Sequence, residues 1–199
     1  MGMGLNMDTD LDMYMDTPQE KLVAIARFAK DAGISIASHD DDSYAKVDFV
    51  KNALGATISE FPVELGVARY AKKLGMATIA GAPNVLTGKS HSGNMPAIEG
   101  ILDGCVTALC SDYYPPAMLE AVFKLHRDYE MPLNECVRFV SLAPALAAGI
   151  GCNTGSIEEG KAADLLLVEA SETYPRLCAV IIGGHVKSTL NYVNRAGGI

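Results

Sequence analysis

Several features that would assign this chain to a familiar class are absent from its sequence. No apolar run approaches the length of a membrane span, and the Met-rich start is acidic, which argues against a secretory signal. A GxSxG nucleophile elbow, a Walker loop and a GxGxxG after a predicted strand are all missing, which disfavours three common kinds of site. The formal net charge of −8 argues against a surface that binds nucleic acid.

The cysteines are few and form no CxxC pair. The 5 cysteines are Cys105, Cys110, Cys136, Cys152 and Cys178. The first two lie in an apolar run, where a free cysteine behaves as a small hydrophobic residue. This usage favours free thiols in a reducing cytoplasm over disulfides. Four cysteines acting together as metal ligands is the less favoured interpretation.

The 199 residues, 49% of them hydrophobic and 20% charged, suffice for one domain with a core of its own. Four short apolar runs are predicted as strands, at residues 34–38, 56–59, 76–81 and 105–110. A predicted helix that ends at a glycine precedes each run, which favours a parallel α/β sheet over a hairpin meander. His39, Glu60 and Gly81 follow one another at intervals of 21 residues, consistent with a repeated strand–helix unit.

The remaining elements divide the chain into three parts. We expect a loose arm at residues 1–16, strand–helix units at 17–152, and a small β-rich segment at 153–199. The predicted helices lie at residues 18–32, 44–54, 63–74, 96–103 and 133–141, with a short one after Pro144. Residues 111–116 open a further helical region, whose helix follows Pro116 and runs to residue 129. Residues 82–95 are predicted to form a loop. In the last part, strands are predicted at 165–168, 179–182 and 185–189, with a hairpin turn at Gly183-Gly184.

Polar residues stand where the predicted strands end, and parallel α/β folds place their chemistry there. His39 is a candidate metal ligand that a neighbouring carboxylate can orient, or else a surface histidine. Asp112 could bind a metal and take a proton from water, or could cap the following helix. Glu60 is a candidate ligand or acid–base group, or an exposed corner residue. Residues 40–42, all Asp, are interpreted as a solvated helix start.

A loop of small residues offers a second kind of site. Its backbone N–H groups could approach a phosphate closely, and Lys89 would supply positive charge. The candidate substrate-binding residues are Lys89, Ser90, His91, Ser92, Gly93 and Asn94. The alternative is an ordinary surface loop. His126 and His185 are interpreted as structural or surface residues.

Five short segments at the ends of the predicted strands and in this loop, taken in chain order, resemble the phosphonate-metabolism amidohydrolases of the carbon–phosphorus lyase pathway. They are Ala37-Ser38-His39-Asp40-Asp41, Ser59-Glu60-Phe61-Pro62, Gly81-Ala82-Pro83-Asn84, Ser90-His91-Ser92-Gly93-Asn94 and Ser111-Asp112-Tyr113. The resemblance implies a metal-dependent hydrolase on a (β/α)₈ barrel with a small β appendage. It also implies α-D-ribose 1-methylphosphonate 5-triphosphate diphosphatase activity, which releases pyrophosphate.

Carried over to this chain, the resemblance makes Asp112 the catalytic base and a ligand of a divalent metal, with zinc the expected ion. His39 resembles the histidine ligand after the fifth barrel strand. Glu60 stands where the wider superfamily usually has another histidine, and His91 could supply that imidazole or contact the substrate phosphates. The His-x-His pair that opens such enzymes is absent, because none of the 4 histidines are two residues apart.

The matching part therefore corresponds to the C-terminal half of an amidohydrolase-type (β/α)₈ barrel plus a small β-rich appendage. Four strands leave two open sheet edges where a closed barrel has eight strands, so we expect a homo-oligomer or a partner chain that supplies the missing half. The expected substrate is small and phosphorylated, with activity reduced or lost in this chain alone. The alternatives are a non-catalytic binding or scaffold remnant of the enzyme, and an amidohydrolase acting on another small substrate.

Overall fold

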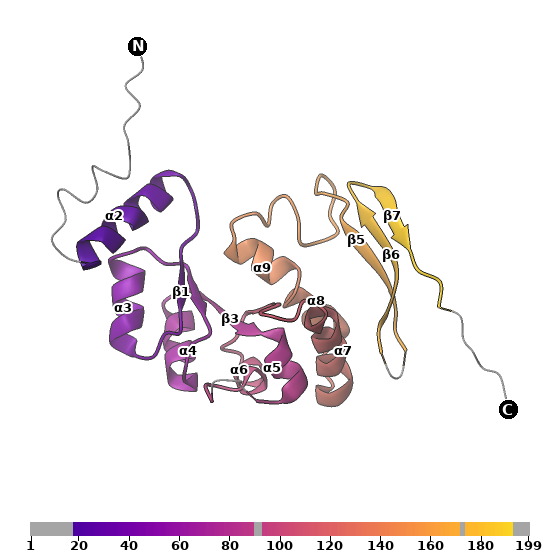
Figure 1. Ribbon diagram of the computed structural model, residues 1–199, viewed down its shortest axis with the longest axis horizontal. Coiled ribbons are helices and arrows are strands. Elements are labelled where there is room, and N and C mark those ends of the chain that lie inside the picture. Colours follow the sequence, from indigo (N-terminus) through magenta and orange to yellow (C-terminus); the bar gives the residue numbers. More distant parts are fainter. Residues whose placement is uncertain (1–17, 90–92, 172–173, 193–199) are drawn as a thin grey trace, which may run out of the picture.

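A computed structural model describes residues 18–89, 93–171 and 174–192 (Figure 1). The predicted N-terminal arm and the loop residues Ser90, His91 and Ser92 lie outside these ranges. In chain order the elements are α2 (Pro18–Asp31), β1 (Ala37–His39), α3 (Tyr44–Asn52), β2 (Ile58–Glu60), α4 (Leu65–Lys73), β3 (Ala77–Gly81), α5 (Ala82–Thr87), α6 (Ala97–Leu102), β4 (Ala108–Cys110), α7 (Ala117–Tyr129), α8 (Leu133–Arg138), α9 (Leu142–Ala147), β5 (Leu165–Glu169), β6 (Arg176–Ile182) and β7 (His185–Thr189).

The first four strands form one parallel sheet in the order β1-β2-β3-β4, which confirms the parallel arrangement predicted from the helix–glycine–strand pattern. The glycine that precedes each strand adopts a left-handed backbone: Gly33, Gly55, Gly75 and Gly104 have φ of 68°, 72°, 77° and 77°. The strands are shorter than the apolar runs. Ile34, the first residue of the first run, is 63% exposed and precedes β1. An apolar side chain alone therefore does not determine which residues pair in the sheet.

Helices pack against this sheet and make the core that holds its corners. One cluster of buried side chains joins α5, α6, α7 and α8 to β3 and β4, and its largest buried side chains are Leu109 and Leu125. A second cluster joins α3 and α4, with Val47 and Val67 among its members, to Ala56 and Met76, which precede β2 and β3. Because the strands are parallel, their carboxyl ends lie at one edge of the sheet, and the two clusters pack the successive strand–helix units against one another.

The structure corrects the predicted loop after β3 and decides the role of Asp112 before α7. Residues 82–87, predicted as the start of a loop, form helix α5, because Pro83 suits the first turn, Val85 is buried and Gly88 (φ 72°) ends the helix. Helix α7 begins at Ala117, after Pro116 as predicted, and Pro116 itself occupies the N-cap position. Asp112 therefore does not cap this helix, which removes the structural alternative considered for that residue.

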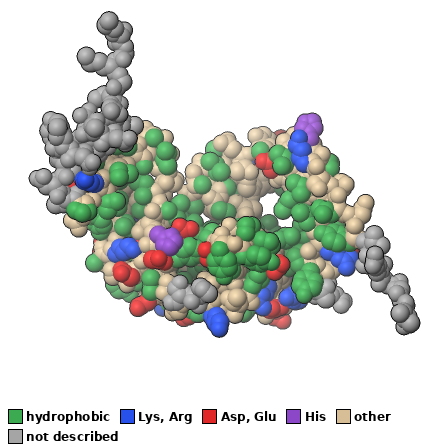
Figure 2. Space-filling model, in the orientation of Figure 1, with side chains coloured by type: hydrophobic (Ala, Val, Ile, Leu, Met, Phe, Trp, Pro, Cys, Tyr) green, Lys and Arg blue, Asp and Glu red, His purple; other side chains and the backbone are tan. Residues whose placement is uncertain are grey.

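The two edges of the parallel sheet differ. Among the described residues, β1 pairs with β2 alone, while the N–H of Leu109 in β4 donates to the carbonyl of Phe139 at 2.9 Å. Helix α2, which precedes β1, exposes an apolar stripe of Leu22 (47% exposed), Ile25 (58%) and Phe28 (54%). Hydrophobic side chains are visible over this region in Figure 2. Neither β1 nor β4 has a second strand partner in the described ranges, as expected for four strands of a barrel, and the hydrogen bond to Phe139 engages the β4 edge at one residue.

The last three strands form a separate antiparallel sheet in the order β5-β6-β7, placed beyond α9 (Figure 1). The hairpin predicted at Gly183-Gly184 is present, and Asp164 Oδ1 accepts a hydrogen bond from Gly183 N at 2.7 Å. Strand β6 begins at Arg176, three residues before the predicted start. Leu166, Leu167 and Val186 of this sheet are 58%, 61% and 62% exposed.

Candidate functional site

His39 and Glu60 are neighbours at the carboxyl edge of the parallel sheet. They are the last residues of β1 and β2, and the strand register pairs them directly. His39 Nδ1 lies 2.9 Å from the carboxylate oxygen Oδ2 of Asp40, and both side chains are more than half exposed. This is the carboxylate–histidine arrangement expected for His39. It engages Nδ1 and directs chemistry at this histidine to Nε2.

The backbone turns sharply behind three of the four strands. Of the four non-glycine residues with positive φ in the part of the chain that the structure describes, three follow strand ends: Asp40 (53°), Phe61 (54°) and Asp112 (49°). A left-handed backbone at such residues costs on the order of 1–3 kcal/mol each and persists where neighbouring contacts enforce it. The three corners repeat one geometry, and their side chains gather at the same edge of the sheet.

Gly81 is the point where these corners meet. A methyl group built on Gly81 would lie 3.3 Å from Asp112 Oδ2, 3.3 Å from Phe61 Cε1 and 3.7 Å from the Asn84 amide nitrogen. The Phe61 ring in turn contacts the His39 ring edge-on, with centroids 5.2 Å apart. Gly81 thus has Asp112 and Phe61 beside it, and Phe61 contacts His39, so these residues lie at one edge of the sheet, as predicted from their positions after strands.

Cys110, the last residue of β4, reports the charge at this edge. Burial raises the pKa of its thiol to about 11; a hydrogen bond with the Asp112 backbone opposes the rise, and the carboxylates of Glu60 and Asp112 add to it. Two carboxylates from different corners therefore act on one sulfur. The five cysteines all lie within the described residues and are free thiols, as predicted.

We expect the Glu60→Gln variant to accelerate alkylation of Cys110 several-fold at pH 8. With a pKa near 11, about one thiol in a thousand is ionised at pH 8, and that fraction rises tenfold per pH unit until the pH reaches the pKa. Removing one negative charge lowers the pKa and increases the thiolate fraction. Iodoacetamide labelling followed by peptide mass spectrometry measures the rate, with exposed Cys152 as the internal control. An unchanged Cys110 rate would show that Glu60 does not act on this thiol.

Asp41 is the residue whose surroundings sequence reasoning missed. The sequence predicts a solvated helix start at residues 40–42, but the Asp41 side chain is fully buried. Its carboxylate accepts hydrogen bonds from Ser38 Oγ and Ser59 Oγ, each at 2.5 Å, and Lys46 Nζ lies 3.8 Å away. The adjacent Asp42 is exposed and pairs with Ser43, so the earlier interpretation holds for that residue. The sequence signal for a buried acid was a serine hydroxyl donor near the end of each of two strands, at Ser38 and Ser59.

The candidate phosphate loop is described only in part. Lys89 is exposed, and its carbonyl accepts a hydrogen bond from Thr87 Oγ1 at 2.9 Å. Gly93 has a left-handed backbone with φ of 77°, and Asn94 is half-buried. The end of this loop is held near the segment that follows β2, because Met95 N donates to the carbonyl of Val63 at 2.8 Å. The contribution of Ser90, His91 and Ser92 falls outside the described residues.

His39, Glu60 and Asp112 share an edge but do not form a metal site by themselves. Within residues 18–89, 93–171 and 174–192, no group of three or more His, Cys, Asp or Glu side chains is arranged to hold a metal ion. A structural or catalytic ion needs at least three protein ligands in most sites of this kind. The described residues therefore do not fit a complete centre, and further ligands are required.

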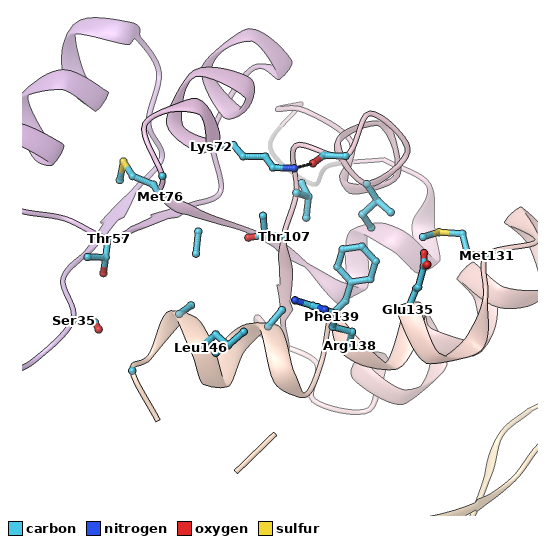
Figure 3. A pocket seen from close by; sticks show the side chains of 18 residues that line it. Ser35, Thr57, Lys72, Met76, Thr107, Met131, Glu135, Arg138, Phe139 and Leu146 are labelled. Atoms are coloured by element: carbon cyan, nitrogen blue, oxygen red, sulfur yellow. Dashed lines mark hydrogen bonds between the residues drawn. The ribbon is translucent and has the colours of Figure 1, made fainter. Parts of the chain in front are cut away.

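A cavity of about 880 Å³ lies at the opposite end of the strands (Figure 3). Ser35, Thr57 and Thr107, which precede β1, β2 and β4, line one side of it. Arg138 and Leu146, from α8 and α9, line the other. Size alone would favour this cavity as a site, but the chemically equipped residues are at the other edge. In parallel barrels that carboxyl edge carries the chemistry.

The sequence profile of the Amidohydrolase family matches residues 15–199. The chain belongs to the amidohydrolase family. It is 38% identical over 158 residues to the alpha-D-ribose 1-methylphosphonate 5-triphosphate diphosphatase of Escherichia coli K12, covering 78% of this chain and 40% of that protein. The family resemblance inferred from the five corner segments is thereby confirmed. The chain spans less than half the length of this curated relative.

Solved structures of other proteins show how much of the amidohydrolase fold this chain contains. An amidohydrolase from Thermotoga maritima superposes with a TM-score of 0.66 and 17% identity over 89% of this chain and 49% of its own. The ochratoxinase of A. niger gives 0.65 and 18% over 87% and 46%. A zinc-bound adenosine deaminase from Xanthomonas campestris gives 0.59 and 16% over 89% and 54%. The predicted fold class, a partial amidohydrolase barrel with a small β sheet, is therefore confirmed.

Proposed function

We propose that this amidohydrolase chain forms the carboxyl-terminal part of the active site of a metal-dependent hydrolase. The observation that carries the proposal is the gathering of His39, Glu60 and Asp112 at one edge of a parallel sheet, around Gly81 and Phe61. The named activity of the Escherichia coli relative suggests the substrate, a ribose 1-methylphosphonate 5-triphosphate. The reaction is addition of water to phosphorus with cleavage of a P–O bond, which releases diphosphate.

Asp112 is the residue we assign to proton transfer. Its carboxylate oxygen Oδ2 faces the small space beside Gly81, and the side chain is exposed to solvent. A carboxylate so placed accepts the proton that the attacking water loses as its oxygen bonds to phosphorus. Lys89 and the residues up to Asn94 are proposed to bind the phosphate groups, since a lysine and loop N–H groups match their charge.

The divalent ion, with zinc as the expected metal, is proposed to bind between this chain and ligands outside the described residues. His39 offers Nε2, and Glu60 and Asp112 offer carboxylates, but these residues do not form a three-ligand group. A second copy or a chain that carries the missing half-barrel would supply the rest. The β1 edge, which is unpaired among the described strands and flanked by the exposed stripe of α2, is the proposed place of attachment.

The chemical surroundings agree with a small anionic substrate rather than a polymer or a membrane. The helices of the described ranges include none that is long and apolar enough to cross a bilayer. The net charge of −8 disfavours nucleic acid. Five free thiols suit a reducing compartment, and we propose a cytoplasmic location.

Co-expression with the missing half of a relative tests this proposal. We expect the chain alone to bind little zinc and to release no diphosphate. Together with the N-terminal part of the Escherichia coli diphosphatase, it should retain about one metal ion or more per complex and hydrolyse the ribose triphosphate substrate. Metal content by mass spectrometry and a diphosphate assay are the measurements. A stable complex that binds zinc yet leaves the substrate intact would refute the diphosphatase assignment.

The lack of a three-ligand group favours one alternative, a non-catalytic binding or scaffold protein derived from the enzyme. Such a protein would bind diphosphate at the Lys89–Asn94 loop, with or without a partner, and would turn nothing over. An amidohydrolase that acts on another small amide or phosphate ester is also consistent with the family. Turnover of such a substrate, but not of the ribose triphosphate, by the co-expressed complex would distinguish it.

A further inference from the structure

Gly81 is a glycine that the backbone does not require. Its φ of −76° and ψ of 129° lie in the extended region that any residue adopts, whereas most described glycines have positive φ. Three others without positive φ have no room for a side chain, because a Cβ at Gly66, Gly100 or Gly151 would lie 2.9, 2.6 or 2.6 Å from a neighbouring atom. A Cβ at Gly81 would approach nothing closer than 3.3 Å. Neither backbone strain nor a severe clash therefore explains the glycine.

The space left by the missing Cβ of Gly81 is bordered by three chemically different groups. The atoms nearest to the Cβ position are Asp112 Oδ2 at 3.3 Å, Phe61 Cε1 at 3.3 Å and the Asn84 amide nitrogen at 3.7 Å. They come from the segments after β4 and β2 and from α5. Gly81 is buried and Asp112 is exposed, so the space lies where the edge of the sheet meets solvent.

This space lies on the sheet face that carries the candidate site. Side chains alternate along a strand, so Gly81 shares a face with Ile79. Ile79 pairs with Glu60, and Glu60 pairs with His39, so all four positions belong to one face. His39 is exposed and Glu60 is half-buried, so helices do not cover this end of the face. The absent side chain of Gly81 thus leaves room beside the proposed site rather than inside the core.

Asn84 brings an unused hydrogen-bond donor to the same space. Its side chain is half-buried and forms no hydrogen bond with any residue that the structure describes. Its backbone carbonyl accepts a hydrogen bond from Gly88 N at 3.0 Å, which fixes the residue within α5. The amide nitrogen carries two N–H donors. A half-buried donor that lacks a protein partner is available to a ligand, because leaving it unpaired costs free energy.

We propose that an oxygen of the substrate's phosphate group occupies the space beside Gly81 and accepts a hydrogen bond from the Asn84 side-chain amide. An oxygen fits this space better than a methyl group does, because it approaches an N–H donor at about 2.7–3.2 Å, whereas a carbon atom packs at about 3.5–4.0 Å. Such a donor stabilises the charge on the phosphoryl oxygens as water attacks phosphorus. The inference rests on the proposed function, to which it adds a residue that contacts the substrate.

The test measures binding of inorganic phosphate to the full chain by ¹H–¹⁵N NMR. We expect phosphate to shift the side-chain amide signal of Asn84 saturably, and the Asn84→Ala spectrum assigns that signal. The backbone signals of Phe61 and Asp112 give the dissociation constant in every variant. Gly81→Ala fills the space and Asn84→Ala removes the donor, so each should weaken phosphate binding at least about tenfold, as expected for a hydrogen bond to a charged group.

Both substitutions should preserve the fold, which thermal melting followed by circular dichroism checks. Alanine adopts the backbone of Gly81 without strain, and Asn84 has no side-chain hydrogen bond to a described residue to lose. Asn134→Ala is the matched control, because it removes an exposed amide from α8 and should leave phosphate affinity unchanged. If Gly81→Ala fails to fold, Asn84→Asp retains the shape of Asn84 but replaces the donor by a carboxylate, and it should abolish binding.

The outcomes distinguish this inference from the proposed function. An Asn84 signal that phosphate does not move, including the case in which only the Lys89–Asn94 loop responds, would overturn the proposal. Unchanged affinity in folded Gly81→Ala or Asn84→Ala would do the same. Binding with the expected losses supports the inference even if the co-expressed complex leaves the ribose triphosphate intact, since the measurement needs no turnover. In an active complex, Asn84→Ala should lower kcat by about 10²–10³-fold with unchanged zinc content, and full activity would exclude this contact.

Discussion

Replacement of Asp112 by Asn in the proposed co-expressed complex is expected to lower kcat by about 10²–10⁴-fold, the usual contribution of a general base. The amide fills the same space beside Gly81 and tolerates the left-handed backbone at this position, where φ is 49°. It cannot accept a proton from the attacking water. The melting temperature should therefore stay close to that of the unsubstituted complex, and a diphosphate assay at saturating substrate measures the loss.

Asp128→Asn is the matched control for this prediction. Asp128 is an acid on α7 whose partners are the surface residues Lys124 and Arg127, and it lies outside the proposed site. Exposed ion pairs contribute little, so turnover should be unchanged. Full activity of Asp112→Asn would remove Asp112 from proton transfer, whereas a parallel loss of folding would require the Asp112→Ser variant to separate the two effects.

Replacement of Gly155 by Ala should destabilise the chain by about 3–5 kcal/mol, the sum of overpacking and backbone strain. The added methyl would lie 2.7 Å from Ala145 Cβ, 3.0 Å from Leu142 Cα and 3.1 Å from the Ser141 carbonyl, while φ is 94°. Two of these neighbours are backbone atoms of α9 and its N-cap residue, which cannot move aside as a side chain can. Urea unfolding followed by circular dichroism measures the change. Because small domains are stable by only about 5–15 kcal/mol, this single methyl removes a large share.

Gly160→Ala separates the two causes. Gly160 has a comparable φ of 86°, but a methyl there would meet nothing within 4 Å. Its cost should be confined to the backbone, about 1–2 kcal/mol. A difference of at least 1 kcal/mol between the two variants would therefore measure the crowding against α9. Equal costs would mean that the segment after α9 relaxes away from the helix.

Much of the fold was predictable because its signals are local. Gly33 and Gly55 each end a helix and precede a strand, and the 21-residue spacing of His39 and Glu60 correctly places them side by side in the register. Helix α5 was missed because six residues that begin with Ala82-Pro83 resemble a turn, and their helical state depends on burial of Val85 beneath neighbouring helices. Local pattern carries no information about such burial.

At the candidate site, sequence alone determined which residues follow the strands and hence which side chains share an edge. Only the tertiary structure decided where each of them points. Asp41 turns inward to Ser38 and Ser59, whereas its neighbour Asp40 turns outward to His39, although both are aspartates in one acidic run. The order of residues in the chain determines which strand end a residue follows. The direction of its side chain depends on a left-handed backbone and on donors from the adjacent strand, and those exist only once the sheet has formed.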